Sequence, residues 1–296
     1  MSNHLEIGPV VVGVDGSESA LRAVRWAAAQ AGRRNVGLRL VHAFELPFRQ
    51  PSGVLEEESI REVLRAQGER WLAVTRDAAV ETVPGLAVDT VSADTSAAML
   101  LVAESATASL VVLGSRGLGG FTGLLIGSTA IRVAAHARCP MVVVRGSGPV
   151  PTTGPVVVGV DGTTTSDAAV AFAFAEAAVR GAELVAVHSW TEPAVHSAVA
   201  AGALVMDFES VVADARNVLA EQLAAWQEKY PHVTVTSVVV HDSPAGALLA
   251  RAATAQLVVV GCRGRGGFLG LVLGSTSQQL LHHAPCPVAV VRPHHG

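Results

Sequence analysis

Residues suited to holding a phosphate group occur twice in the chain with one spacing. GSRG at 114–117 is followed nine residues later by GST at 127–129, and GCRG at 261–264 is followed nine residues later by GST at 274–276. Glycines let the main chain approach phosphate oxygens, a helix start offers free N–H groups, and arginine adds charge-assisted hydrogen bonds. The alternative is an ordinary strand-to-helix turn with serine as N-cap. Duplication at a fixed spacing favours phosphate binding.

An aspartate follows the first apolar run of each copy. Asp15 stands in VGVDG, and Asp161 stands in the same five residues 146 positions later. An aspartate at the carboxyl end of a strand can accept hydrogen bonds from a ribose or an adenine edge, or help to hold Mg²⁺. It can instead cap the following helix, which is worth about 1 kcal/mol. For Asp15 taken alone, the sequence favours the cap.

Histidine and cysteine also recur at matching positions. His42 and His188 close the second apolar run of each copy, and no acid–nucleophile pair accompanies them. We expect both side chains to face solvent at a strand end without a catalytic role. Cys262 lies inside the second glycine loop, where backbone N–H groups could lower its pKa and make it redox-sensitive. The favoured interpretation is a small filler, because Ser115 occupies the same place in the first copy.

The other two cysteines, Cys139 and Cys286, each precede a proline at the start of the last apolar run. We expect both to be structural. Three cysteines without a close CxxC pair argue against a disulfide framework and against a zinc site.

The whole chain is a duplication. Four anchors recur in one order at offsets of 146 or 147 residues: the aspartates, the histidines, the glycine loops and the Cys-Pro pairs. A period of this length is too long for a solenoid or a propeller, so the repeated unit is a domain. We predict domains at 1–146 and 155–296, with a linker at 147–154 that is rich in glycine, proline and threonine.

Short apolar runs alternate with helical stretches in each copy. Valine-rich runs predict strands buried on both faces, and the helices between them predict right-handed crossovers. The fold class is therefore α/β, with two tandem doubly wound, Rossmann-like domains that each contain a five-stranded parallel sheet covered by helices on both faces. Ligands are expected at the carboxyl ends of the strands. The predicted strands are 9–14, 37–43, 86–91, 109–114 and 140–145, then 156–161, 183–189, 233–240, 256–261 and 287–292. The predicted helices of the first copy are 17–33, 55–81, 95–106 with Asp94 as its cap, and 128–137 after Gly127.

Composition excludes several other classes of protein. Hydrophobic residues make up 50% of the chain and aromatic residues 4%, so valine, alanine and leucine must fill the interior. The net charge of −4 and the absence of a long Lys/Arg run argue against nucleic acid as a partner. No signal peptide and no apolar run of about 18 residues is present, so we expect a cytoplasmic protein without membrane insertion.

The glycine loops and the VGVDGS turn resemble the ATP-binding branch of the universal stress protein family. The resemblance covers the chain twice, as in tandem actinobacterial members. The loops match neither GxxxxGK[ST] nor a GxGxxG after the first strand, and the first turn is not SGGxDS.

The resemblance implies that ATP, with Mg²⁺, occupies each domain, although the sequence leaves the metal ligands undetermined. The first turn and the second strand would hold adenosine, and the glycine loop with its helix start would hold the phosphates. The binding residues would be Gly13, Val14, Asp15, Val41, Gly114, Arg116, Gly117, Gly120, Gly127, Ser128 and Thr129. In the second copy they would be Gly159, Val160, Asp161, Val187, Gly261, Arg263, Gly264, Arg265, Gly267, Gly274, Ser275 and Thr276. Because Arg265 replaces Leu118, we expect tighter phosphate binding in the second copy.

The function expected from this site is nucleotide-dependent regulation in stress response or growth control, with one ATP per domain. We expect no enzyme, because beyond Asp15 and Asp161, which the nucleoside would occupy, no duplicated group could position a water or take a proton. Two alternatives remain: a slow Mg²⁺-dependent ATP hydrolase or phosphotransferase, and a nucleotide-free dimerising scaffold. The fifth strand of such a domain is an edge that favours pairing, and the resemblance implies that it pairs domains, so residues 141–145 and 288–292 join either the two halves of one chain or two chains. A homodimer of tandem chains and a protein partner of unknown identity are expected.

Overall fold

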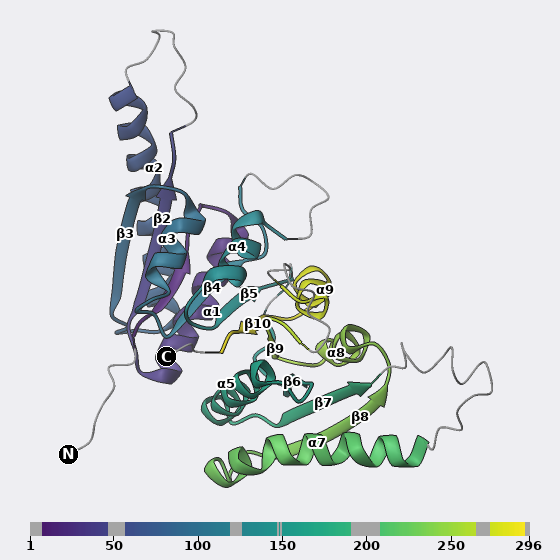
Figure 1. Ribbon diagram of the computed structural model, residues 1–296. Coiled ribbons are helices and arrows are strands. Elements are labelled where there is room, and N and C mark those ends of the chain that lie inside the picture. The colour runs from purple at the N-terminus through teal and green to yellow at the C-terminus, as the bar shows by residue number, and fades with distance from the viewer. Residues whose placement is uncertain are drawn as a thin grey trace, which may run out of the picture. The chain divides into compact units, whose positions relative to one another are not determined.

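The computed structural model (Figure 1) describes residues 8–46, 57–118, 126–146, 148, 150–190, 208–264 and 273–293. The chain divides into two units, Met1–Val150 and Pro151–Gly296. The division falls inside the segment 147–154 that we expected as a linker. Each unit is described by itself below.

The described part of the first unit contains five strands in one sheet. Their order across the sheet is β3-β2-β1-β4-β5, and every neighbouring pair is parallel. β1 is central, and its Val10 aligns with Leu38 of β2 and Leu110 of β4. The strands are β1 (Val10–Gly13), β2 (Leu38–Phe44), β3 (Val88–Asp94), β4 (Leu110–Gly114) and β5 (Met141–Val144).

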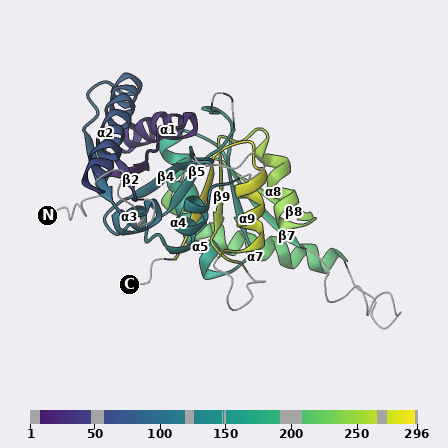
Figure 2. The same cartoon turned by 90° about the horizontal axis from the view of Figure 1, so that it is seen from above.

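Helices cover both faces of this sheet. α1 packs on α2 and α3 packs on α4, and Figure 2 shows these two pairs on opposite sides of the strands. The strand order changes direction between β1 and β4, which is the point where doubly wound sheets bind ligands. The helices are α1 (Glu18–Arg34), α2 (Glu57–Thr82), α3 (Ala97–Glu104) and α4 (Ser128–His136).

The second unit repeats this arrangement in the described residues. Its five parallel strands have the order β8-β7-β6-β9-β10, with α5 packed on α7 and α8 packed on α9. The predicted fold class is confirmed, and element ends differ from the sequence prediction by only a few residues. The elements are β6 (Val156–Val160), α5 (Thr164–Arg180), β7 (Leu184–Trp190), α7 (Phe208–Lys229), β8 (Val235–His241), α8 (Pro244–Ala252), β9 (Leu257–Gly261), α9 (Ser275–His283) and β10 (Val288–Val291).

Local sequence explains where α1 begins and ends. The Ser17 hydroxyl accepts a hydrogen bond from the Ala20 N–H, which satisfies one of the free donors at the helix start. At the other end Asn35 adopts a left-handed conformation with φ of 53°, and its N–H bonds back to the helix carbonyls. α1 is therefore fixed at both ends directly behind the first turn.

The central strands are buried on both faces, as their valine-rich sequences predict. Val10, Val11 and Val12 of β1 have no exposed surface. The prediction is wrong for β3 and β8, whose residues are mostly half-buried or exposed. Each of these strands is outermost in the strand order of its unit on one side, so less of it is covered by neighbours.

The prediction that Asp94 caps the third helix is also wrong. α3 begins after Ser96, whose hydroxyl accepts a hydrogen bond from the Met99 N–H. Asp94 is still part of β3, and its carboxylate accepts a hydrogen bond of 2.9 Å from Nε of Arg61 in α2. Serine two residues later takes the cap because the strand continues through Asp94.

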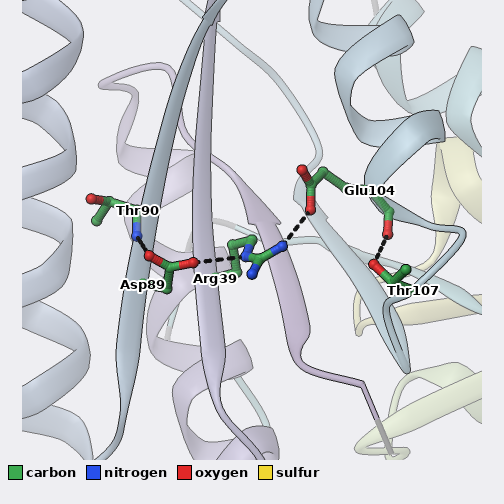
Figure 3. A network of polar contacts seen from close by, with 5 residues as sticks. All are labelled: Arg39, Asp89, Thr90, Glu104 and Thr107. Atoms are coloured by element: carbon green, nitrogen blue, oxygen red, sulfur yellow. Dashed lines mark hydrogen bonds and ion pairs between the residues drawn. The ribbon is translucent and has the colours of Figure 1, made fainter.

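A polar network joins three elements at the amino end of the sheet (Figure 3). Arg39 of β2 donates to Asp89 of β3 at 2.9 Å and to Glu104 of α3 at 3.1 Å. The hydrogen bond to Glu104 contributes most to raising the pKa of the Arg39 guanidinium. The network lies at the end of the sheet opposite to the glycine loops.

Candidate functional site

A cavity of about 480 Å³ opens at the carboxyl ends of β1, β2 and β4. It brings together ten of the eleven site residues predicted for the first copy, and Gly120 lies outside the described residues. Parallel strands place their carboxyl ends at one edge of the sheet, so residues distant in sequence meet there. The ten lining residues are Gly13, Val14, Asp15, Val41, Gly114, Arg116, Gly117, Gly127, Ser128 and Thr129.

Asp15 joins the first turn to the glycine loop. Its Oδ1 accepts the Ser17 N–H at 3.1 Å, and its Oδ2 accepts the Leu118 N–H at 3.0 Å. The helix cap is Ser17, so Asp15 does not cap α1. A carboxylate has about four acceptor positions, and these two bonds leave room for a hydroxyl of a bound molecule.

Two of the loop glycines lie against protein atoms. A Cβ on Gly117 would overlap Oδ2 of Asp15, so a side chain there would displace the Asp15 carboxylate. A Cβ on Gly114 would lie 2.5 Å from Oγ of Ser19 and 2.7 Å from its backbone, because α1 packs directly on the end of β4. Packing against α1 therefore requires glycine at position 114 before any ligand is considered.

Gly127 differs from these two glycines. A Cβ there meets nothing within 4 Å among the described residues, and its φ of −72° suits any amino acid. Neither packing with the described residues nor backbone conformation explains a glycine at this position. Among the described residues, the space directly in front of this helix start is open, and a phosphate group has the right charge to fill it.

The first turn of α4 has unused donors that point to an anion. The N-cap is Gly127, which has no side chain to accept a hydrogen bond, whereas Ser17 caps α1 and Ser96 caps α3. The alternative in which serine caps this helix is therefore wrong. The N–H groups of residues 128–130 have no hydrogen-bond partner among the residues that the structure describes.

One wall of the cavity consists of apolar side chains that were not among the predicted site residues. They come from β2, α3, the end of β4 and the residue before Gly127. The sequence could have indicated Ala43. Side chains alternate between the two faces of a strand, so Ala43 lies on the same face of β2 as Val41 and lines the site if Val41 does. An apolar wall beside a polar end suits a molecule with a hydrophobic ring and a charged group. These lining residues are Ala43, Ala97, Leu100, Leu101, Leu113 and Ile126.

The second unit places its predicted residues in the same way. Oδ1 of Asp161 accepts bonds from the Thr163 N–H at 3.0 Å and the Thr163 hydroxyl at 2.7 Å. A Cβ on Gly264 would lie 2.5 Å from Oδ2 of Asp161. α9 begins after Gly274 without a side-chain cap, so Ser275 and Thr276 are its first residues.

The remaining predicted residues of the second unit follow the first. Gly159 and Val160 end β6, and Val187 lies in the middle of β7. Gly261 ends β9, and Arg263 follows two residues later. Arg265 and Gly267 lie outside the described residues.

The expectation that the two histidines face solvent is wrong. His42 is 4% exposed and His188 is 5% exposed. Nδ1 of His42 lies 2.7 Å from the Val14 carbonyl oxygen, and Nδ1 of His188 lies 2.9 Å from the Val160 carbonyl oxygen. Alternation along β2 turns His42 away from the cavity, towards the face that α2 covers.

The cysteines are buried thiols. Cys262 and Ser115 are both buried, and their carbonyl oxygens accept the N–H groups of Gly274 and Gly127, so the two residues fill one role in the two loops. Burial raises the pKa of Cys139 to about 12. The three cysteines are free thiols.

Within the described part of the chain, His, Cys, Asp and Glu form no group of three or more that could hold a metal ion. Of the helices that are described, none combines the length and apolar character required to cross a membrane.

Fold and site together define a class of protein: a tandem pair of doubly wound α/β domains with a cavity at the carboxyl ends of the parallel strands. The sequence profile of the universal stress protein family matches residues 6–145 and again residues 152–292. The chain therefore belongs to the universal stress protein family.

Known relatives agree with this membership. Universal stress protein Rv2005c of Mycobacterium tuberculosis is 39% identical over 294 residues, which covers 96% of each chain. The crystal structure of a universal stress protein from Archaeoglobus fulgidus has a TM-score of 0.71 at 18% identity, over 97% of this chain and 99% of that one, and shows the fold alone. A universal stress protein solved in complex with cAMP covers 47% of this chain at 26% identity with a TM-score of 0.36, and its ligand is a property of that protein.

Proposed function

We propose that each unit binds one ATP and that nucleotide occupancy makes this protein a cytoplasmic regulator in stress response or growth control. The observation that carries the proposal is the cavity of about 480 Å³, where Asp15 faces an α4 N-terminus that lacks a side-chain cap. The adenosine lies along Val41 and the apolar wall, and the phosphates lie in front of Gly127. The helix dipole and the backbone N–H groups at the start of α4 favour the negative charge of the phosphates there.

Mg²⁺ fits this site as a companion of the phosphates. Asp15 supplies a carboxylate, and Ser128 and Thr129 supply hydroxyl groups, which are the oxygen ligands that Mg²⁺ accepts. With few protein ligands, the ion would keep waters and phosphate oxygens in its shell and would neutralise phosphate charge. Asp15 therefore has two uses, as an acceptor for the nucleoside and as a partner of the hydrated ion.

Regulation is favoured over rapid catalysis. Hydrolysis needs a group that positions water or accepts its proton. Among the described lining residues, Asp15 is the carboxylate, and it already accepts two backbone N–H groups. Arg116 carries a permanent positive charge and cannot act as a base. We expect turnover to be slow or absent.

The proposal is tested on protein purified without added nucleotide. The protein is denatured, and the released small molecules are identified by chromatography and mass spectrometry, beside Gly117→Ala/Gly264→Ala. Nearly two ATP per chain in the native protein and little in the variant support the proposal. No nucleotide in either sample, with none bound on titration, supports the scaffold. ADP alone supports a hydrolase.

Assembly is a separate part of the proposal. Pairing of domains is what the family resemblance implies, and we propose a homodimer of tandem chains that presents its nucleotide state to a protein partner. Sedimentation velocity with and without ATP measures the mass. A monomer under both conditions would contradict this part and leave nucleotide binding untouched.

A further inference from the structure

Two buried histidines repeat at one position of the two units, and His42 lies outside the cavity of the first unit. His42 lies in β2 and His188 lies in β7, 146 residues later. Each places Nδ1 within hydrogen-bond distance of a carbonyl oxygen at the end of the neighbouring strand. His42 lies 2.7 Å from the oxygen of Val14, which directly follows β1, and His188 lies 2.9 Å from the oxygen of Val160, the last residue of β6. A buried polar group needs a partner, and this repeated partner is the residue before the aspartate.

The hydrogen bond determines which ring nitrogen of the histidine carries a proton. A carbonyl oxygen only accepts hydrogen bonds, so Nδ1 must carry the proton and donate. The bond persists whether or not Nε2 is also protonated. His42 is therefore a fixed donor aimed at the turn that carries Asp15.

Peptide geometry transmits this bond to the aspartate. The Val14 carbonyl belongs to the same planar peptide unit as the N–H and Cα of Asp15. The N–H of Val14 bonds at 2.8 Å to the carbonyl oxygen of Val41, so consecutive residues of β2 hold both sides of Val14. Rotation of the Val14–Asp15 peptide would break the histidine bond and swing the Asp15 carboxylate.

α2 supports the histidine from behind. A Cβ on Gly68 would overlap Cδ2 of His42 and lie 2.8 Å from Nε2, so the ring rests on a helix position that has no side chain. Glycine inside a helix costs about 1 kcal/mol of stability relative to alanine. The glycine at position 68 is explained by the His42 ring, which occupies the space that a side chain would need. The ring of Trp71 meets His42 edge-on, with centroids 5.3 Å apart, and also covers Gly16, which has a φ of +82°.

We propose that His42 and His188 are positioning residues that hold Asp15 and Asp161 in the orientation that accepts the nucleoside. This assignment rests on the proposed nucleotide binding. It gives each site a support on the far face of the sheet, where the histidine touches no ligand. Loss of the donor should weaken ATP binding without removing any atom from the cavity.

The test compares two paired variants. His42→Asn/His188→Asn keeps an N–H donor near the place of Nδ1, and His42→Leu/His188→Leu keeps bulk without the donor. ATP affinity is measured by titration calorimetry with Mg²⁺ present. We expect at least a tenfold loss for the leucine pair and less than a threefold loss for the asparagine pair. Val10→Ala, at the other end of β1, controls for lost stability and should keep wild-type affinity.

The outcomes separate this inference from the proposed function. Wild-type protein that binds no ATP overturns the proposed function, and the assignment with it. Wild-type binding with an unaffected leucine pair overturns the positioning role alone. An asparagine pair that loses as much affinity as the leucine pair also overturns it, because the donor would then not be what matters. Loss in the leucine pair with recovery in the asparagine pair supports it.

Discussion

Asp15 and Gly117 meet so closely that a methyl group on Gly117 would overlap Oδ2 of Asp15. Asp161 and Gly264 repeat the relationship in the second unit, where the added carbon would lie 2.5 Å from Oδ2. The N–H of Leu118, the residue after Gly117, donates to the same oxygen of Asp15. The first turn and the glycine loop are thus one structural unit, and disturbing the glycine disturbs the aspartate.

Gly117→Ala should remove one nucleotide per chain and leave the other. The added methyl displaces the Asp15 carboxylate while the second unit keeps its own aspartate. Calorimetry with ATP should give a stoichiometry near one for this variant and near zero when Gly264→Ala is added. Gly148→Ala, where a Cβ meets nothing within 4 Å among the described residues, is the matched control and should keep wild-type stoichiometry. Two equal sites in Gly117→Ala would contradict this role of Asp15.

Gly127→Ala should weaken ATP binding at almost no cost in stability. Its φ and the described residues around it accept a methyl group, so the free energy of unfolding should change by less than about 0.5 kcal/mol. A phosphate in contact with this residue would be pushed away from the α4 N-terminus, and affinity should fall at least tenfold. Thermal unfolding without nucleotide and calorimetry with ATP measure the two effects. Unchanged affinity would place the phosphates elsewhere.

The second site should bind ATP more tightly than the first. Arg265 stands where the first copy has Leu118, and one charge-assisted hydrogen bond of about 1.5 kcal/mol corresponds to roughly tenfold in affinity. Gly117→Ala isolates the second site for titration, and Gly264→Ala isolates the first. The difference should shrink at high salt and disappear in Arg265→Leu. Equal affinities in the two isolated sites would show that Arg265 does not reach the phosphates.

Arg180→Ala should destabilise the second unit strongly. Arg180 and Glu176 are 2% and 0% exposed and form an ion pair of 2.9 Å in α5. Removing Arg180 takes away the cation beside a buried carboxylate, a change that typically costs about 3 to 5 kcal/mol. Glu176→Leu/Arg180→Leu should cost less, because both charges disappear together. Urea unfolding measures both variants, and an equal loss in the two would contradict the argument.

Cys139 should make the native protein less stable at alkaline pH. Burial raises the folded pKa to about 12 from an ordinary value of 9.0, so the folded state holds the proton more tightly than the unfolded chain. This contribution is complete below pH 9 and is lost as the pH rises towards 12. The free energy of unfolding should fall less steeply above pH 9 in Cys139→Ala. Identical slopes would show that the thiol does not contribute.

The sequence was sufficient to predict the fold. Strand ends such as Gly13 and Gly114 follow from short apolar runs, and parallel order follows from the alternation of strands with helices. The ten described site residues of the first copy lie around one cavity because parallel strands end at one edge. Local patterns failed at Asp94, where the strand continues to the last residue before the turn and leaves Ser96 to cap α3.

What the sequence determined by itself is therefore the duplication, the element order and the residue types at the strand ends, since these depend on neighbours along the chain. Only the tertiary structure decided what each residue does. Leu118 donates to Asp15 across 103 positions, and His42 bonds Val14 across 28. Protein atoms already occupy the space that a side chain on Gly114 or Gly117 would need. At Gly127 none of the described residues occupies that space. Which atoms occupy the space before a glycine depends on packing between distant segments, and no local pattern encodes it.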